Sequence, residues 1–266
     1  MSTFRALRTT AFVLMTLGVA SAAPARAGYP VAPDVAVFCE PTLLHAVTDV
    51  AAAWRAQTGV PVHIFTSPTW ALLQQVAHHA RDDVIIGEGE AEAASAAETK
   101  TIKPETLQRL WRNQLVVAAD RKNIENASAG SPAATDNLAA LAGKAPIAIV
   151  DPWAAAAGAD SEKALQSLGL WQAISGKYVG VVGTADAAYL LAQGKVELAV
   201  VYATDAAADP GFRITDRLPT GNYPPIVYWV ALPEYSLSPN AAKFIAFLHQ
   251  AQVQQRVRAD GLEVLP

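Results

Sequence analysis

Residues 198–206, LAVVYATDA, form the stretch around which the rest of the chain can be arranged. The four apolar residues 198–201 predict a buried strand, and Thr204 and Asp205 then favour a turn or a helix start. In open α/β sheets, ligands bind beyond the carboxyl ends of the strands. Tyr202 is therefore placed to direct its phenol at a ligand, although a tyrosine packed at a domain edge would leave the same pattern.

Composition and the first residues restrict the class of protein. Of the 266 residues, 52% are hydrophobic and 17% are charged, which suits a globular protein of one large or two small domains. Residues 1–27 combine Arg5 and Arg8 with a short apolar run and a small-x-small site at 25–27, as in a cleavable secretory signal peptide. Cleavage takes the formal charge from −4 to −7, because three arginines and no acid are lost. Nucleic acid and anionic membranes are therefore disfavoured as partners.

The first half of the chain alternates between strands and helices. The expected order is strand, helix, strand, helix, strand, which predicts a parallel, doubly wound sheet. The ranges are 34–38, 43–57, 60–65, 70–79 and 83–86. An acidic stretch, 88–105, follows, and its Glu88, Glu90 and Glu92 are expected to form a solvated face, although their spacing would also let them face one way.

The second half repeats this alternation and then returns. Strands are expected at 115–119, 147–150, 178–182 and 198–201, helices at 161–168 and 185–193, and a polar loop at 123–136. Residues 212–214 could cross back to a strong strand at 225–232 and an amphipathic closing helix at 240–258. Two α/β halves with two crossings predict two lobes, from 28–113 with 215–266 and from 114–214. A ligand cleft is expected between them.

Cys39 is the only cysteine, so an intrachain disulfide is excluded. Cys39 precedes a helix start, where it could act as a nucleophile or, with Glu40 and His45, help to hold a cation, but a buried inert thiol is the alternative. The chain shows no nucleotide-binding glycine pattern, no nucleophilic-serine motif and no zinc-spaced cluster. The sequence therefore predicts no cofactor, no metal site and no catalytic residue.

Taken together, the segments resemble the periplasmic molybdate-binding proteins of ABC importers over nearly all of the mature chain. The resemblance rests on the order of several segments: LLHAVTDVAAAWRAQTGVPV, DDVIIG, NQLVVAADRKN, IAIVDPWAAAAG, LAVVYATDA and PPIVYWVAL. It implies a two-lobed α/β periplasmic binding protein, each lobe a mostly parallel sheet flanked by helices. It also implies a monomer that is not an enzyme, that closes on molybdate or tungstate in the periplasm, and that touches the membrane only through an ABC permease.

The same resemblance implies which residues hold the ligand. The family binds its oxyanion with hydroxyls and backbone N–H groups at helix N-termini, which carry unpaired donors and a partial positive charge. Carried over position by position, the contacts fall on Thr42, Thr69, Ala157, Thr184 and Tyr202. Two tryptophans that follow ligand-bearing turns, Trp70 and Trp153, are further candidates to line the site, as are Cys39 and Glu40.

The turns of this chain depart from the family pattern. The first turn is small and neutral in the family, but here it reads Cys39-Glu40-Pro41-Thr42, and Pro68 in the second turn has no N–H to donate. A carboxylate about 4 Å from a unit negative charge costs about 4 kcal/mol at an effective dielectric of about 20. Three alternatives follow: Glu40 points away, Glu40 is protonated, or the ligand is a less charged anion, an organic molecule or a metal ion. An exported enzyme or metal-handling protein using Cys39 and Glu40 remains the alternative from another class.

Overall fold

The computed structural model describes residues 34–78, 82–121 and 147–265. The predicted signal peptide, 1–27, and the predicted loop at 123–136 lie outside these residues. Within them, no helix has the length and apolar content that a membrane span requires. Residues 31–266 group together as one unit, which contains two β-sheets.

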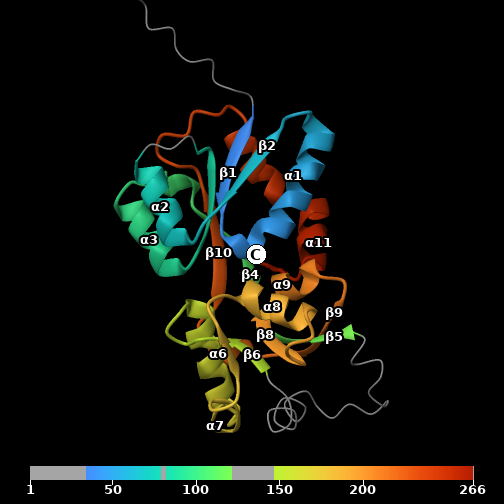
Figure 1. Ribbon diagram of the computed structural model, residues 1–266. Coiled ribbons are helices and arrows are strands. Elements are labelled where there is room, and N and C mark those ends of the chain that lie inside the picture. The colour runs from blue at the N-terminus through green and yellow to red at the C-terminus, as the bar shows by residue number, and fades with distance from the viewer. Residues whose placement is uncertain (1–33, 79–81, 122–146, 266) are drawn as a thin grey trace, which may run out of the picture. The chain divides into compact units, whose positions relative to one another are not determined.

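The first sheet has six strands in the order β11-β4-β10-β3-β1-β2 (Figure 1). The strands are β1 (Val35–Cys39), β2 (Val62–Thr66), β3 (Val84–Glu88), β4 (Gln108–Asn113), β10 (Ile226–Ala231) and β11 (Glu263–Val264). β1 pairs in parallel with β2 and β3, whereas β10 and β11 pair antiparallel with their neighbours. The sheet is therefore mixed, with its parallel pairs among β1, β2 and β3.

Helices cover both faces of this sheet, which explains why its central strands are apolar throughout. The helical segments are η1 (Pro41–Leu43), α1 (Leu44–Thr58), α2 (Thr69–Ala77), α3 (Glu90–Glu98), η2 (Pro104–Thr106), α10 (Ala241–Leu248) and α11 (Ala251–Ala259). Val35 and Val37 of β1 pack into the cluster that includes residues of α1, α10 and α11. The alternate residues Ala36 and Phe38 pack with α2 and α3 on the other face, as the ribbon also shows (Figure 1).

The second sheet has five strands in the order β7-β6-β8-β5-β9. Its strands are β5 (Leu115–Asp120), β6 (Ile147–Val150), β7 (Val179–Val181), β8 (Leu198–Tyr202) and β9 (Phe212–Arg217). Its helical segments are α6 (Ala156–Ser167), α7 (Trp171–Ile174), α8 (Thr184–Ala192), α9 (Ala203–Ala208) and η3 (Thr220–Asn222). β6 pairs in parallel with β7 and β8, but β5 runs antiparallel to β8 and β9, so this sheet is mixed as well.

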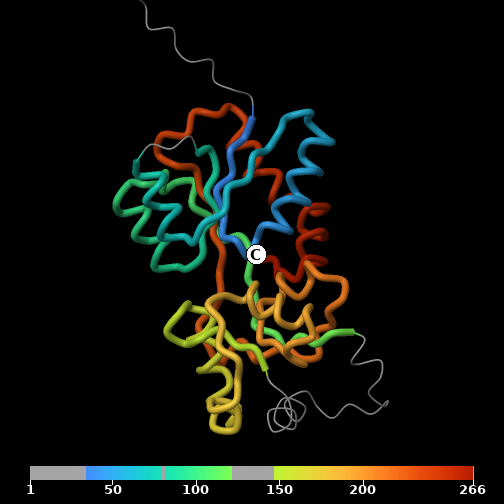
Figure 2. Tube along the Cα trace, in the orientation of Figure 1, coloured from blue at the N-terminus to red at the C-terminus, as the bar shows by residue number. Residues whose placement is uncertain are grey.

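The chain passes between the sheets twice, which is the number of crossings predicted. It leaves the first sheet between β4 and β5, and it returns between β9 and β10; both passages can be followed in the Cα trace (Figure 2). The strands of the first sheet therefore come from residues before 114 and after 225. The predicted lobe boundaries are compatible with this topology but stay a prediction.

Several helical segments differ from the prediction. The acidic stretch after β3 contains α3, α6 begins at Ala156 and not at residue 161, and the closing helix is interrupted between α10 and α11. At the interruption, Gln250 is extended, with φ −68° and ψ 140°. The side-chain amide of Gln254 donates to the carbonyl of Leu248, which α10 leaves unpaired at its end.

Candidate functional site

The five residues predicted to hold a ligand share one structural position. Each lies where a strand of one of the two sheets gives way to a helical segment. Thr42 is in η1 after β1, Thr69 begins α2, Ala157 is in the first turn of α6, Thr184 begins α8, and Tyr202 ends β8 and precedes α9. Helix N-termini offer unpaired N–H groups, so this position suits the binding of an anion or another acceptor-rich ligand.

The two hydrogen-bond donors of Thr69 are already paired with a carboxylate of the same chain. Its backbone N–H and its hydroxyl both donate to Oε1 of Glu40. The Thr69 hydroxyl oxygen in turn accepts the backbone N–H of Glu88 at 2.7 Å. Glu40 therefore points toward the start of α2, where Thr69 is one of the predicted contacts.

Burial raises the pKa of the Glu40 carboxyl, the two hydrogen bonds from Thr69 oppose that rise, and the nearby Glu92 adds to it. Burial also raises the pKa of Glu88, to about 8, with Glu40, Asp160 and Glu92 contributing in the same direction. Neither Glu40 nor Glu88 takes part in an ion pair among the described residues. Two carboxyl groups without a partner of opposite charge in the described part of the chain thus lie beside the predicted contacts. The expectation that Glu88 belongs to a solvated acidic face is wrong, because its carboxyl is buried.

Tyr228, a fully buried residue of β10, joins Thr42 to this group. Its hydroxyl lies 2.9 Å from the hydroxyl of Thr42, accepts from Asn113 Nδ2 at 3.1 Å, and is hydrogen-bonded to Glu88. Asn113 Nδ2 also donates to the hydroxyl of Thr204, at 2.9 Å. Because Asn113 ends β4 of the first sheet and Thr204 lies in α9 after β8, this buried polar chain connects the two sheets.

Tyr202 lies close to the same acids. Its side chain is only 4% exposed, and burial, followed by the charges of Glu88, Tyr228 and Asp160, raises the pKa of its phenol well above the ordinary value. The phenol therefore keeps its proton at neutral pH and can donate it in a hydrogen bond. Its backbone N–H donates to Asp205 at 3.3 Å, and this bond fixes the start of α9.

Thr184 and Ala157 stand apart from the Glu40 group. The hydroxyl of Thr184 is hydrogen-bonded to Asp205, whose pKa burial raises to about 6. Ala157 is buried, and its carbonyl accepts from Ser161 at 2.6 Å. The link from α6 to the other contacts is Asp160, whose charge acts on Glu88 and Tyr202.

The additional candidates fall into two groups. Trp70 is 64% exposed and Trp153 is 81% exposed, so neither is a core residue. Cys39 is fully buried, and burial together with Glu40 raises the pKa of its thiol to about 12. A thiol that stays protonated is a poor nucleophile and a poor soft-metal ligand, so Cys39 acts as a packing residue.

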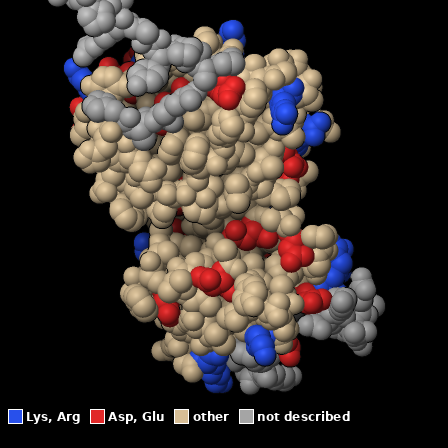
Figure 3. Space-filling model, turned by 45° about the horizontal axis from the view of Figure 1, so that its top comes forward, with Lys and Arg blue, Asp and Glu red and all other residues tan. Residues whose placement is uncertain are grey.

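Two hollows elsewhere on the surface are lined by none of the predicted ligand contacts or additional site candidates. One of about 310 Å³ lies where the chain leaves the first sheet, and Asn113 is the only member of the buried polar chain among its lining residues. Another, of about 340 Å³, is lined by residues of α3, β4 and β10, together with Leu107. On the face drawn in Figure 3, acidic side chains occupy the middle, whereas most lysine and arginine atoms lie toward the margins.

Comparison with known proteins places this chain in a family. A family model described as bacterial extracellular solute-binding protein matches residues 35–263. The molybdate-binding protein ModA of Escherichia coli (strain K12) is 26% identical over 230 residues, which cover 86% of this chain and 89% of that protein.

Two solved structures share the fold. A substrate-binding domain from Clostridium difficile, assigned to a molybdenum ABC transporter, superimposes with a TM-score of 0.73 at 19% identity and covers 88% of this chain and 99% of its own. The periplasmic molybdate-binding protein of Azotobacter vinelandii gives 0.67 at 21% identity, with 88% and 100% covered. With a family match that extends from β1 to β11, this chain belongs to the bacterial extracellular solute-binding proteins.

Proposed function

We propose that this protein captures molybdate or tungstate in the periplasm and delivers the anion to the permease of an ABC importer, without catalysing a reaction. The observation that carries the proposal is the common position of Thr42, Thr69, Ala157, Thr184 and Tyr202 at strand-to-helix junctions of both sheets. The name of the E. coli relative supports the choice of anion. Export by the predicted signal peptide and a monomeric state are parts of the same proposal.

The donors at these positions suit a tetrahedral oxyanion. Hydroxyl groups of Thr42 and Tyr202 and the first N–H groups of α6 and α8 can each donate one hydrogen bond. A ligand bound between elements of two sheets stabilises the arrangement in which both contribute, which is the usual basis of lobe closure in binding proteins. Because the donors are neutral, selection rests on size and geometry and not on countercharge.

The carboxyl group of Glu40 makes the proposed oxyanion binding depend on pH. Its carboxylate takes the two Thr69 donors that an oxyanion would need, and Glu88 stands beside them. A dianion about 4 Å from an ionised carboxylate would lose several kcal/mol at an effective dielectric of about 20. We therefore propose that the oxyanion binds when Glu40 and Glu88 are protonated, so that a carboxyl O–H becomes a donor and binding takes up protons.

A second candidate ligand follows from the same observation. The Glu40 carboxylate already accepts both Thr69 donors, as a bound anion would. A ligand with less negative charge than a dianion would be repelled less strongly by this carboxylate. The exposed rings of Trp70 and Trp153 suit a small organic molecule better than a bare oxyanion. A monoanionic organic acid is the candidate of this class.

The test is calorimetric titration of untagged, ligand-stripped protein with micromolar molybdate, tungstate, sulfate and phosphate. We expect molybdate and tungstate to bind, and to bind more tightly at about pH 6 than at about pH 8.5, because anion binding favours the protonated carboxyls. A titration with organic acids runs in parallel. Binding of an organic acid alone would replace the oxyanion by the second candidate, and affinity that rises with pH would contradict the protonation requirement.

A further inference from the structure

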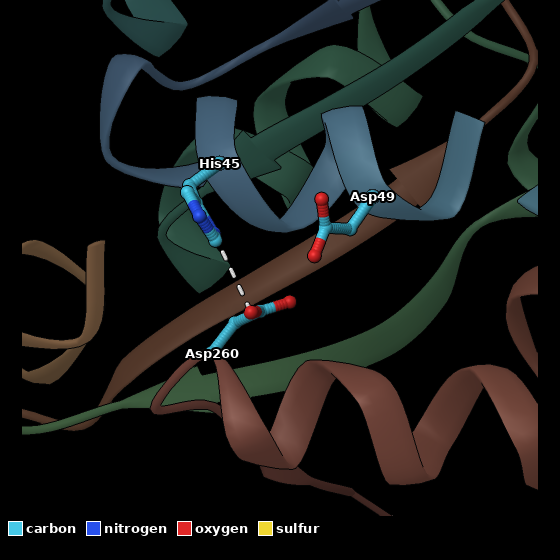
Figure 4. A group of neighbouring side chains, drawn as sticks. All are labelled: His45, Asp49 and Asp260. Carbon is cyan, nitrogen blue, oxygen red and sulfur yellow. Dashed lines mark ion pairs between the residues drawn. The ribbon is translucent and has the colours of Figure 1, made fainter. Parts of the chain in front are cut away.

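Three metal-ligating side chains gather outside the site described above. His45 and Asp49 lie four residues apart on α1, a spacing that brings both onto one face of a helix. Asp260 directly follows α11, which packs beside α1 (Figure 1). Figure 4 shows the three side chains converging on one gap between these helices, and one ligand atom from each lies within 4.8 Å of the others.

The spacing of the ligand atoms fits a small metal ion. His45 Nδ1 and Asp260 Oδ1 are 3.4 Å apart. Zinc binds imidazole nitrogen and carboxylate oxygen at about 2.0–2.2 Å, so two ligands of a tetrahedral ion stand about 3.4 Å from each other. Asp49 is exposed and can turn inward as the third ligand, which would leave a fourth position for water.

The buried member of the group, Asp260, has a carboxylate oxygen without a hydrogen-bond partner among the described residues. Asp260 is only 8% exposed, and its Oδ2 has no hydrogen-bond partner in the described structure. In Figure 4 this second oxygen turns toward the side of Asp49. Burial raises the pKa of Asp260, Asp49 adds to the rise, and His45 and Arg256 oppose it. A buried carboxylate oxygen without a partner carries a desolvation cost that a cation would offset.

We propose that His45, Asp49 and Asp260 bind one divalent transition-metal ion, for which Zn²⁺ is the best match in ligand type and spacing. The ion would fasten α1 to the turn that follows α11. That turn also lies against α9, the helix that follows β8 of the second sheet, because a Cβ on Gly261 would stand 2.5 Å from the carbonyl oxygen of Ala203. The metal site is separate from the solute site, since it uses none of the residues proposed to contact the oxyanion.

The experiment titrates untagged, chelator-treated protein with Zn²⁺ by calorimetry, and with Co²⁺ by visible absorption. We expect one equivalent to bind, the Co²⁺ spectrum to show nitrogen and oxygen ligands, and Zn²⁺ to raise the melting temperature. Losing a group that only orients a metal ligand costs about 10–100-fold in affinity, so His45→Ala and Asp49→Asn should each weaken binding at least tenfold.

The chain offers a matched control. His63 and Asp34 form another exposed histidine–aspartate pair, at 3.1 Å, but belong to no group of three such ligands within the described residues. His63→Ala should therefore leave Zn²⁺ affinity unchanged. Absence of Zn²⁺ binding to the wild-type protein, or equal loss in the His63 and His45 variants, would overturn the proposal. All three exchanged residues are exposed, so the variants should fold, and their metal-free melting temperatures verify this.

Discussion

Glu40 is the residue on which the proposed ligand chemistry depends most directly. Replacing it by glutamine keeps an oxygen that can accept from Thr69 but removes the charge. We expect Glu40→Gln to bind molybdate at least tenfold more tightly than wild type at about pH 8.5, since the repulsion at stake is about 4 kcal/mol per ionised carboxylate. The gain should shrink toward pH 6, where the wild-type carboxyl takes up a proton on binding.

The control for this substitution is a glutamate outside the group. Glu90 is exposed and paired with Arg109 at 2.7 Å, and Glu90→Gln should leave molybdate affinity and its pH dependence unchanged. Calorimetry at the two pH values measures both variants. Equal affinities for wild type and Glu40→Gln at the higher pH would show that Glu40 moves aside when the anion enters.

At this scale the sequence predicted the hydroxyl-bearing residues but not their neighbours. Periodicity singled out Tyr202 at the end of an apolar strand, whereas Thr42 and Thr69 came from the resemblance to the molybdate-binding proteins, and their contact with a ligand stays a prediction. Glu88 and Tyr228 are direct partners across the antiparallel pair of β3 and β10, although 140 residues separate them in the chain. Pairing register between distant strands leaves no local signal, and a glutamate at a strand end looks like any other surface acid.

Among the elements, α6 is positioned by a close backbone approach beside its proposed ligand contact, Ala157. Gly158 lies in the first turn of α6, and a Cβ there would stand 2.2 Å from the carbonyl oxygen of Asp151. Backbone cannot move aside as a flexible side chain would. We expect Gly158→Ala to lower the free energy of unfolding by about 1–3 kcal/mol and to weaken oxyanion binding by shifting the N–H groups of α6.

The matched control is Gly176, where a Cβ would meet nothing within 4 Å. Urea denaturation and calorimetry of Gly158→Ala and Gly176→Ala separate crowding from the general effect of replacing glycine. A Gly158 variant that is as stable as the Gly176 variant and binds the oxyanion normally would mean that α6 can shift without affecting the site.

Two helices that sequence reasoning missed or displaced, α3 and α6, are rich in alanine. α3 buries only Ala93 and Ala96, and α6 begins with two alanines, so neither start shows the apolar periodicity of a helix such as α1. Alanine favours helices but contributes little to a hydrophobic pattern. The interruption between α10 and α11 was missed because the apolar spacing continues through it.

For the whole molecule, the class of fold could be predicted and the pairing of its strands could not. Alternating strands and helices indicated α/β sheets, and both sheets contain the expected parallel strands. Each sheet also contains strands that arrive from the other half of the chain and pair antiparallel, such as β10 in the first and β5 in the second. Strand direction depends on where the chain re-enters, which periodicity does not encode.

Several buried carboxyls together set the pH dependence of stability. Burial raises the pKa of Glu88 to about 8 and those of Asp82 and Asp205 to about 6, from ordinary values of 4.5 and 3.8. Between the ordinary and the raised pKa, the folded state holds more protons than the unfolded state. Stability is therefore fully present below the ordinary pKa values and is lost as pH rises through the raised ones.

We accordingly expect the free energy of unfolding to fall as pH rises from about 4.5 to about 8, with one pKa unit of difference corresponding to about 1.4 kcal/mol. Urea denaturation across this range measures the slope. Glu88→Gln, which cannot ionise, should flatten the slope between about pH 6 and pH 8, whereas the same change at the exposed Glu98 should not. Stability that rises with pH would mean that these carboxyls are ionised in the folded protein, and proton-coupled anion capture would lose its physical basis.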